Sequence, residues 1–257
     1  MSVDYRFDGG AAWLTLTRPD RGNALDVPTA SALLAGVRRA VADDARVVVL
    51  ASQGDAFCVG GDLAAMQNAE EPGKYVEELA NTLHDAVAGL MRMDAVVVSV
   101  VQGVAAGGGF PLAAAADLVL AAESARFVLA YTKVGLSPDG GSTMLPATFG
   151  LHRALHLALL NPVWSATQAR DAGLVAQVHP DAELGGAAEA VVAQLLAGSR
   201  SAQVAAKRLL RDHSESAPEQ AMALETRAIS TAVAGPDGQE GLRAFFAKST
   251  PAFPSSS

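Results

Sequence analysis

The stretch Gly103-Val-Ala-Ala-Gly107-Gly-Gly-Phe-Pro-Leu-Ala113 lies between a predicted buried strand, residues 96–101, and a predicted helix. Glycines let the backbone approach a bound molecule closely. The start of a helix presents unpaired N–H groups and a partial positive charge. Together these features suit an oxyanion that develops during a reaction. Taken alone, however, the triple glycine is better explained as a tight packing turn.

A second glycine loop, Asp55-Ala-Phe-Cys-Val-Gly-Gly-Asp-Leu63, has the same setting. It follows the predicted strand 46–51 and precedes a helix, for which Asp62 is a suitable N-cap. An ordinary capped turn would explain this loop as well. The two loops are about 47 positions apart, and finding both between a strand and a helix favours a shared site.

The elements around these loops predict an α/β fold. An amphipathic helix is expected over 76–93, a helix over 142–160, and short strands at 118–120 and 174–178. Strands that alternate with helices indicate a mostly parallel sheet covered by helices. From 181 to 248 the pattern is almost wholly helical, so we expect a core over residues 1–195 and a C-terminal helical region over 196–257 that serves oligomerisation and pocket closure.

Composition excludes several classes of function. Half of the 257 residues are hydrophobic, and the net charge is −8, which argues against a nucleic-acid surface or a basic membrane patch. The single cysteine, Cys58, excludes an intramolecular disulfide and a cysteine zinc cluster. The uncharged stretch 95–116 could span a bilayer, but glycines and Pro111 interrupt it. With no signal-peptide pattern at the start, we expect a cytoplasmic protein.

Four motifs in order resemble the crotonase superfamily, the enoyl-CoA hydratase/isomerase family. The resemblance covers nearly the whole chain and implies the ClpP/crotonase-like spiral of β-β-α units, an acyl-CoA substrate and a homotrimer or homohexamer. The motifs are Arg18-Pro-x-x-x-Asn-Ala-Leu25, Phe57-Cys-x-Gly-Gly-Asp-Leu63, Gln102-Gly-Val-Ala-Ala-Gly-Gly-Gly109 and Glu240-Gly-Leu-Arg-Ala-Phe-Phe-Ala-Lys248.

The resemblance implies roles for individual residues. The backbone N–H groups of Gly61 and Gly108 would form the oxyanion hole over the thioester carbonyl. Plain surface charge explains Arg21 equally well, and Lys248 would act from a neighbouring subunit. Residues expected near the CoA moiety are Ala24, Leu25, Asp62 and Leu63, with Arg21 and Lys248 as candidates for its phosphates.

The sequence departs from the family at the catalytic carboxylates. Hydratases that resemble it carry two glutamates, and the matching positions here are Pro111 and Tyr131. Adding water across a double bond in that mechanism needs two groups to hold and activate the water. Ordinary hydratase activity is therefore not expected, and Tyr131 is predicted to be a pocket wall.

A different carboxylate is offered by Gly135-Leu-Ser-Pro-Asp-Gly-Gly141. The segment resembles the enoyl-CoA isomerase branch, in which an acid in this loop takes a proton from C2 and returns it to C4. Apolar neighbours such as Leu136 would partly desolvate Asp139 and make it a stronger base. The simpler interpretation is a type I turn over Ser137-Pro-Asp-Gly140. The family context favours catalysis by Asp139.

We therefore expect an enoyl-CoA isomerase of fatty acid metabolism with no metal or redox cofactor, in which coenzyme A arrives as part of the substrate. Three alternatives stay open: a hydratase that uses water and Asp139, a thioesterase- or dehalogenase-like enzyme with Asp139 as nucleophile, and an inactive acyl-CoA-binding protein. The dehalogenase branch also uses a base on a helix. His84 is expected to be a surface or hydrogen-bonded helix residue, and Asp117 to be structural.

Overall fold

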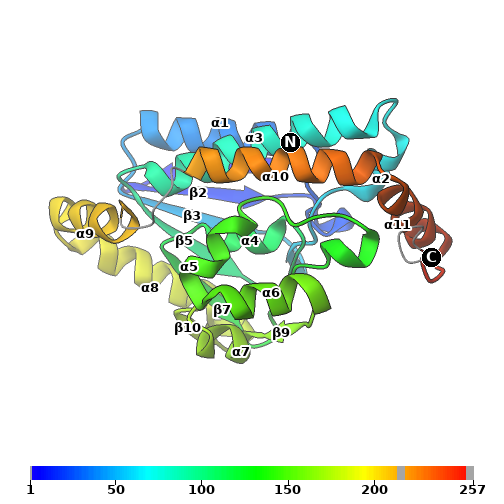
Figure 1. Ribbon diagram of the computed structural model, residues 1–257. Coiled ribbons are helices and arrows are strands. Elements are labelled where there is room, and N and C mark those ends of the chain that lie inside the picture. The colour runs from blue at the N-terminus through cyan, green and yellow to red at the C-terminus, as the bar shows by residue number, and fades with distance from the viewer. Residues whose placement is uncertain (1, 213–217, 253–257) are drawn as a thin grey trace.

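The computed structural model describes residues 2–212 and 218–252 (Figure 1). Its larger sheet has six strands in the order β1-β2-β3-β5-β7-β10, and all neighbours are parallel except the β1–β2 hairpin. These strands are β1 (Val3–Asp8), β2 (Ala11–Leu16), β3 (Val47–Ser52), β5 (Val96–Val101), β7 (Leu118–Ala122) and β10 (Gln177–His179).

A smaller sheet of four short strands has the order β4-β6-β8-β9. The strands β3, β5 and β7 of the larger sheet are each followed along the chain by one strand of the smaller sheet, so the chain climbs in repeated turns. This is the expected spiral. The four short strands are β4 (Ala56–Cys58), β6 (Val104–Ala106), β8 (Arg126–Val128) and β9 (Trp164–Ser165).

Helices cover both faces of the larger sheet. In Figure 1, α1 (Val27–Ala42), α3 (Pro72–Arg92) and α10 (Pro218–Ala234) lie above the sheet, and α8 (Leu184–Ala197) lies below it. The β3 side chains alternate between these faces, as a period of two requires. Val48 and Leu50 belong to the core under α1 and α3, whereas Val47 and Val49 pack with the buried side chains of α8.

Shorter helices complete the layers. The C-terminal region is helical where the structure describes it, as predicted, although the expected boundary at 195–196 falls inside α8. The division into two regions stays a prediction, and residues 253–257 of the predicted C-terminal region lie outside the described residues. The remaining helices are α2 (Leu63–Asn68), α4 (Gly109–Ala114), α5 (Leu145–Phe149), α6 (Leu151–Leu160), α7 (Ala166–Asp171), α9 (Arg200–Asp212) and α11 (Pro236–Ala247).

Two predicted elements differ from the structure. The predicted helix 142–160 is divided into a 3-10 turn, α5 and α6, because Gly150 has a φ of 86°, which a continuous helix does not allow. The strand predicted over 174–178 begins only at Gln177. Leu174 N–H donates to Ala169 O (2.9 Å) at the end of α7, so this residue closes a helix and does not extend the sheet.

The uncharged stretch 95–116 forms β5, β6 and α4, as the glycine interruptions predict. Within residues 2–212 and 218–252, no helix has the length and apolar character needed to cross a bilayer.

Asp117 joins α9 to the sheet through buried charge. Its carboxylate lies 2.9 Å from Lys207 Nζ and 2.7 Å from an Arg211 guanidinium nitrogen, and it accepts the Val97 N–H at 2.8 Å. Burial lowers the pKa of Lys207, which the Asp117 charge partly offsets. The network accounts for a structural role of Asp117.

Replacing Asp117 with asparagine is expected to lower the free energy of unfolding by about 2 kcal/mol, because hydrogen bonds to charged groups are lost from a buried site. Urea denaturation of both proteins measures the change. Asp171→Asn is the matched control, since Asp171 pairs only with its exposed neighbour Arg170 among the described contacts. An equal loss in both variants would contradict the assignment.

Candidate active site

The two glycine loops meet because the strands that precede them are neighbours. β4 and β6 pair in parallel, with Cys58 opposite Ala105. A Cβ on Gly60 would lie 2.9 Å from Ala106 O and 3.3 Å from Gly108 N, and the φ of Gly60 is 94°. Only glycine fits this position.

The backbone around Gly61 is held by hydrogen bonds on both sides. Leu25 N–H donates to Gly60 O (2.8 Å), and Asp62 N–H donates to Leu25 O (2.8 Å). Across the described ranges, neither Gly61 N–H nor Gly108 N–H donates to a backbone or side-chain acceptor of the protein. Gly108 directly precedes α4, where the helix supplies partial positive charge. Neither amide is therefore used by a hydrogen bond within the described residues, and the oxyanion-hole role stays a prediction.

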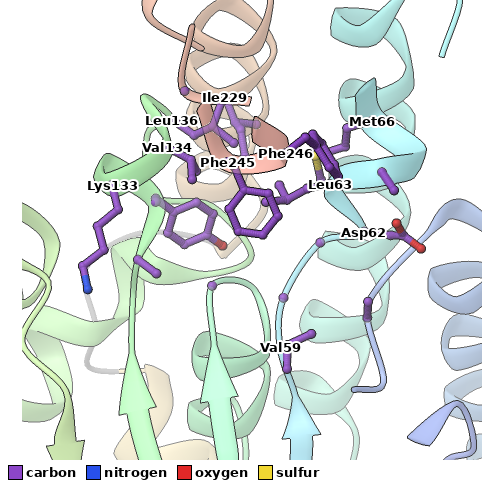
Figure 2. A pocket seen from close by; sticks show the side chains of 18 of the residues that line it. Val59, Asp62, Leu63, Met66, Lys133, Val134, Leu136, Ile229, Phe245 and Phe246 are labelled. Atoms are coloured by element: carbon purple, nitrogen blue, oxygen red, sulfur yellow. The ribbon is translucent and has the colours of Figure 1, made fainter. Parts of the chain in front are cut away.

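A cavity of about 720 Å³ opens beside the glycine loops, which is within the range of small-molecule sites. Its walls are mainly apolar and come from α2, α10, α11 and the loop after β8. In Figure 2, Phe245 and Phe246 extend from α11 into the space between Val134 on one side and Leu63 and Met66 on the other. The cavity therefore suits a small molecule with a partly apolar surface.

Five of the seven residues predicted to bind substrate line this cavity. Leu25 and Lys248 do not: Leu25 is buried behind the loops, and Lys248 is the exposed C-cap of α11, next to Ser249, which does line it. The lining residues among the predicted ones are Arg21, Ala24, Asp62, Leu63 and Tyr131.

The charged residues that line the cavity include two that the sequence predicts and one that it does not. Asp62 caps α2 by accepting the Ala65 N–H (3.1 Å), as predicted, and it also lies 3.4 Å from an Arg21 nitrogen. Lys133 is a cation that the sequence reasoning missed, and it lines the cavity with its amine directed away from Phe245 (Figure 2). Its position two residues after the predicted pocket wall Tyr131 was the available signal.

Tyr131 forms the inner wall. Its hydroxyl donates to the backbone O of Asp139 (3.1 Å) and would lie 3.6 Å from a Cβ on Gly108. Gly108 and Asp139 are not among the cavity-lining residues, and Asp139 is only 6% exposed. The Tyr131 hydroxyl therefore lies between the cavity wall and the backbone of Gly108 and Asp139.

Pro111 and Tyr131 stand at the two positions where similar hydratases carry glutamate. Both of them contact the loop that contains Asp139. Tyr131 holds the Asp139 carbonyl, as described above. A Cβ on Gly140 would lie 3.3 Å from Pro111 Cγ, and a Cβ on Gly141 would lie 3.9 Å from Pro111 Cβ. Pro111 and Tyr131 thus contact the segment that bears the alternative carboxylate.

The turn at Asp139 lies two residues later than predicted. Ser142 N–H donates to Asp139 O (3.3 Å), so the reversal spans Asp139–Ser142 and not Ser137–Gly140. Gly140 and Gly141 both have positive φ, 70° and 99°, which places the two glycines at the centre of the turn. The Ser142 hydroxyl also donates to Asp139 O (2.7 Å). Asp139 therefore opens this turn, and its backbone carbonyl is held by Ser142.

His84 is the main residue that the sequence reasoning missed. Its Nε2 lies 2.8 Å from Asp139 Oδ1, and both side chains are buried. The expectation of a surface position is wrong, whereas that of a hydrogen-bonded helix residue is confirmed. The available signal was helical spacing: His84 lies next to Leu83 and three residues before Val87, on the apolar face of α3.

Cys58 belongs to the glycine loop 55–63 and is fully enclosed. Burial raises the pKa of its thiol to about 12, although the Gly60 N–H donates to Sγ. Very little of the reactive thiolate form is therefore present near neutral pH. We expect no alkylation of the native protein by iodoacetamide at about pH 8, and one adduct per chain in denaturant. Mass spectrometry measures both, and rapid native labelling would contradict the expectation.

Comparison with known proteins gives a consistent picture. The family model described as enoyl-CoA hydratase/isomerase matches residues 6–256. The chain is 34% identical over 253 residues to a probable enoyl-CoA hydratase of Rhodobacter capsulatus, covering 98% of this chain and 97% of that protein. It is also 34% identical over 251 residues to the 1,2-epoxyphenylacetyl-CoA isomerase of Escherichia coli, covering 95% of each.

A solved structure shares the fold. The crystal structure of an enoyl-CoA hydratase from Mycobacterium avium subsp. paratuberculosis superposes with a TM-score of 0.90 at 32% identity, covering 98% of each chain. This likeness confirms the predicted crotonase spiral.

Proposed function

Because the chain belongs to the enoyl-CoA hydratase/isomerase family, we propose that it shifts the double bond of a 3-enoyl-CoA to the 2,3 position. The observation that carries the proposal is the placement of Asp139, a buried acidic residue on a turn that packs against Gly108, where Pro111 and Tyr131 replace the usual glutamates. The Escherichia coli relative named as an isomerase also supports it.

The reaction needs one base and one oxyanion site. Asp139 takes a proton from C2, and the electron pair of that C–H bond moves into a dienolate. The negative charge on the thioester oxygen is stabilised by the Gly61 and Gly108 N–H groups, at about 3–4 kcal/mol for each well-placed donor. The same carboxyl then delivers its proton to C4, and the C2–C3 double bond forms. No atom is gained or lost, so neither water nor a redox cofactor takes part.

Asp62 is the other buried carboxylate near these loops, and its contacts argue against it as the base. It caps α2 and lies within 4 Å of guanidinium nitrogens of both Arg18 and Arg21. Its Oδ1 accepts the Ala65 N–H and its Oδ2 faces both guanidinium groups, so each oxygen already has a partner in the protein. It is better suited to the CoA-binding side of the cavity.

A second candidate function is thioester hydrolysis, which the His84–Asp139 contact favours. Asp139 would attack the thioester carbonyl, the CoA thiolate would leave, and water activated by His84 would cleave the resulting anhydride. The relatives named as hydratases favour a third reaction, water addition.

One set of assays separates these reactions. The protein is incubated with a 3-enoyl-CoA and, separately, with a 2-enoyl-CoA. Conjugated thioester is followed by ultraviolet absorbance, hydroxyacyl-CoA by mass spectrometry and free CoA by a thiol reagent. We expect conversion of the 3-enoyl-CoA with little hydration or CoA release. Release of CoA would favour the hydrolase, hydration the hydratase, and binding without turnover of either substrate an acyl-CoA-binding protein.

The remaining proposals concern the setting of the enzyme. We propose that it acts in the cytoplasm as a homotrimer or homohexamer, with coenzyme A entering only as part of the substrate. Three leucines one turn apart on α6 support self-association, because Leu151, Leu155 and Leu159 are all exposed. Sedimentation velocity measures the assembly.

A further inference from the structure

A chain of three side chains connects the C-terminal helical region to the proposed catalytic carboxylate. Thr226 on α10 has its Oγ1 3.1 Å from His84 Nδ1, and His84 Nε2 on α3 is 2.8 Å from Asp139 Oδ1. All three residues are buried, with exposed fractions of 4–6%. We propose, on the basis of the function proposed above, that His84 and Thr226 are positioning residues that hold the Asp139 carboxylate for proton transfer.

The first step concerns the proton between His84 and Asp139. A ring nitrogen and a carboxyl oxygen at 2.8 Å form a hydrogen bond only if one of them carries a proton. Asp139 must be a carboxylate to accept a proton from C2, so in the reactive state that proton lies on Nε2. His84 is therefore a donor to Oδ1.

The second step concerns Thr226. Its hydroxyl lies 3.0 Å from Asn81 Oδ1 and 3.3 Å from Met222 O, in addition to His84 Nδ1. A hydroxyl donates once and accepts twice. Thr226 can donate to Nδ1 when the imidazole is neutral, and it can accept from Nδ1 when the ring carries both protons. In either state Nε2 keeps its proton, so Thr226 holds the ring in one orientation toward Asp139.

The third step links this arrangement to the chemistry. His84 occupies Oδ1, so Oδ2 is the oxygen left for substrate. Transfer of a proton from C2 to C4 takes place on one face of the dienolate. It is fastest when the carboxylate does not rotate, so that Oδ2 and Oδ1 do not exchange places. The Asp139 carbonyl is held separately by Tyr131 and Ser142, so both the backbone and the carboxylate are fixed. Position governs rate strongly in such proton transfers.

The test uses paired variants of the full chain. His84→Leu and Thr226→Val remove the hydrogen-bonding groups, whereas His84→Gln and Thr226→Ser retain a donor and a hydroxyl. Thr82→Val is the control, because Thr82 is a half-buried threonine of α3 that bonds only to Glu78 O among the described contacts. For each variant, kcat and KM are measured with a 3-enoyl-CoA. The fraction of C2 deuterium recovered at C4 is measured as well, and melting temperatures identify variants that fold poorly.

We expect His84→Leu to lower kcat about 10- to 100-fold, with KM within about threefold of wild type, because a hydrogen bond to a charged group is lost. The kcat of His84→Gln is expected to be about tenfold higher than that of His84→Leu. Thr226→Val is expected to lower kcat about fivefold, and Thr226→Ser to stay within about twofold. Deuterium recovered at C4 is expected to fall in His84→Leu, since a carboxylate that rotates exposes the proton to exchange.

Two results overturn the proposal. One is an unchanged kcat in both His84→Leu and Thr226→Val. The other is an equal loss in His84→Gln and His84→Leu in folded proteins, which assigns the ring to proton transfer itself. Neither result affects the proposed isomerase function, which fails only if the wild-type protein does not convert the 3-enoyl-CoA.

Discussion

Replacing Asp139 with asparagine is expected to lower kcat for 3-enoyl-CoA isomerisation by about 10³-fold, within the range found for loss of a general acid–base group. Asparagine has nearly the same shape as aspartate. In the wild-type chain His84 Nε2 lies 2.8 Å from Asp139 Oδ1, and the asparagine Oδ1 can still accept that N–H. Its amide nitrogen cannot take a proton from C2. The fold and KM should therefore be nearly unchanged while proton transfer is lost.

Steady-state kinetics over a range of 3-enoyl-CoA concentrations separates kcat from KM. Asp171→Asn serves as the matched control, because it makes the same chemical change on the surface of α7, far from the glycine loops in sequence. Full isomerase activity in Asp139→Asn would remove Asp139 from the mechanism. A variant that melts well below wild type would be replaced by Asp139→Ser, for which the same loss is expected.

The second large effect is expected from Gly108→Pro. The φ of Gly108 is −61°, close to the value that proline imposes, so the substitution removes the N–H with little change in the backbone. Loss of one oxyanion donor typically costs about 10²–10³-fold in kcat. We expect a loss of that size for isomerisation, measured by the same assay.

Gly108→Ala is the control, because it adds a side chain and keeps the N–H. A Cβ at this position would lie 3.5 Å from Leu25 Cδ1, 3.6 Å from Tyr131 Oη and 3.8 Å from Leu83 Cδ2, all ordinary van der Waals contacts. Its kcat is expected to stay within about tenfold of wild type, since no donor is lost. Equal losses in the two variants would show that the space at Gly108 matters and that its amide does not.

Local pattern was sufficient to predict the elements that carry the glycine loops. The buried strand 96–101 and the N-cap Asp62 both appear in the structure as predicted. These features depend on neighbours within a few residues, which a sequence displays directly. Errors arose where a single backbone angle decided the outcome, as at Gly150, or where a helix cap extended into a predicted strand, as at Leu174.

The site could be predicted only in part, because its partners are far apart in the chain. The predicted positions Gly61, Gly108 and Asp139 lie near one another, but their roles stay predictions. The His84–Asp139 contact spans 55 positions, and no periodicity in either segment indicates it. The sequence also showed that Pro111 and Tyr131 carry no carboxylate. It did not show that both residues contact the Asp139 turn.

The close approach of Gly60 to Gly107 and Gly108 has a consequence for folding cooperativity. The two loops follow β4 and β6, which belong to successive turns of the chain, so the paired amides exist only when those turns are stacked. Opening either turn separates the donors and exposes the buried strands β3 and β5 behind them. The proposed catalysis thereby depends on the packing of buried strands, and we expect activity in denaturant to disappear together with the global fold.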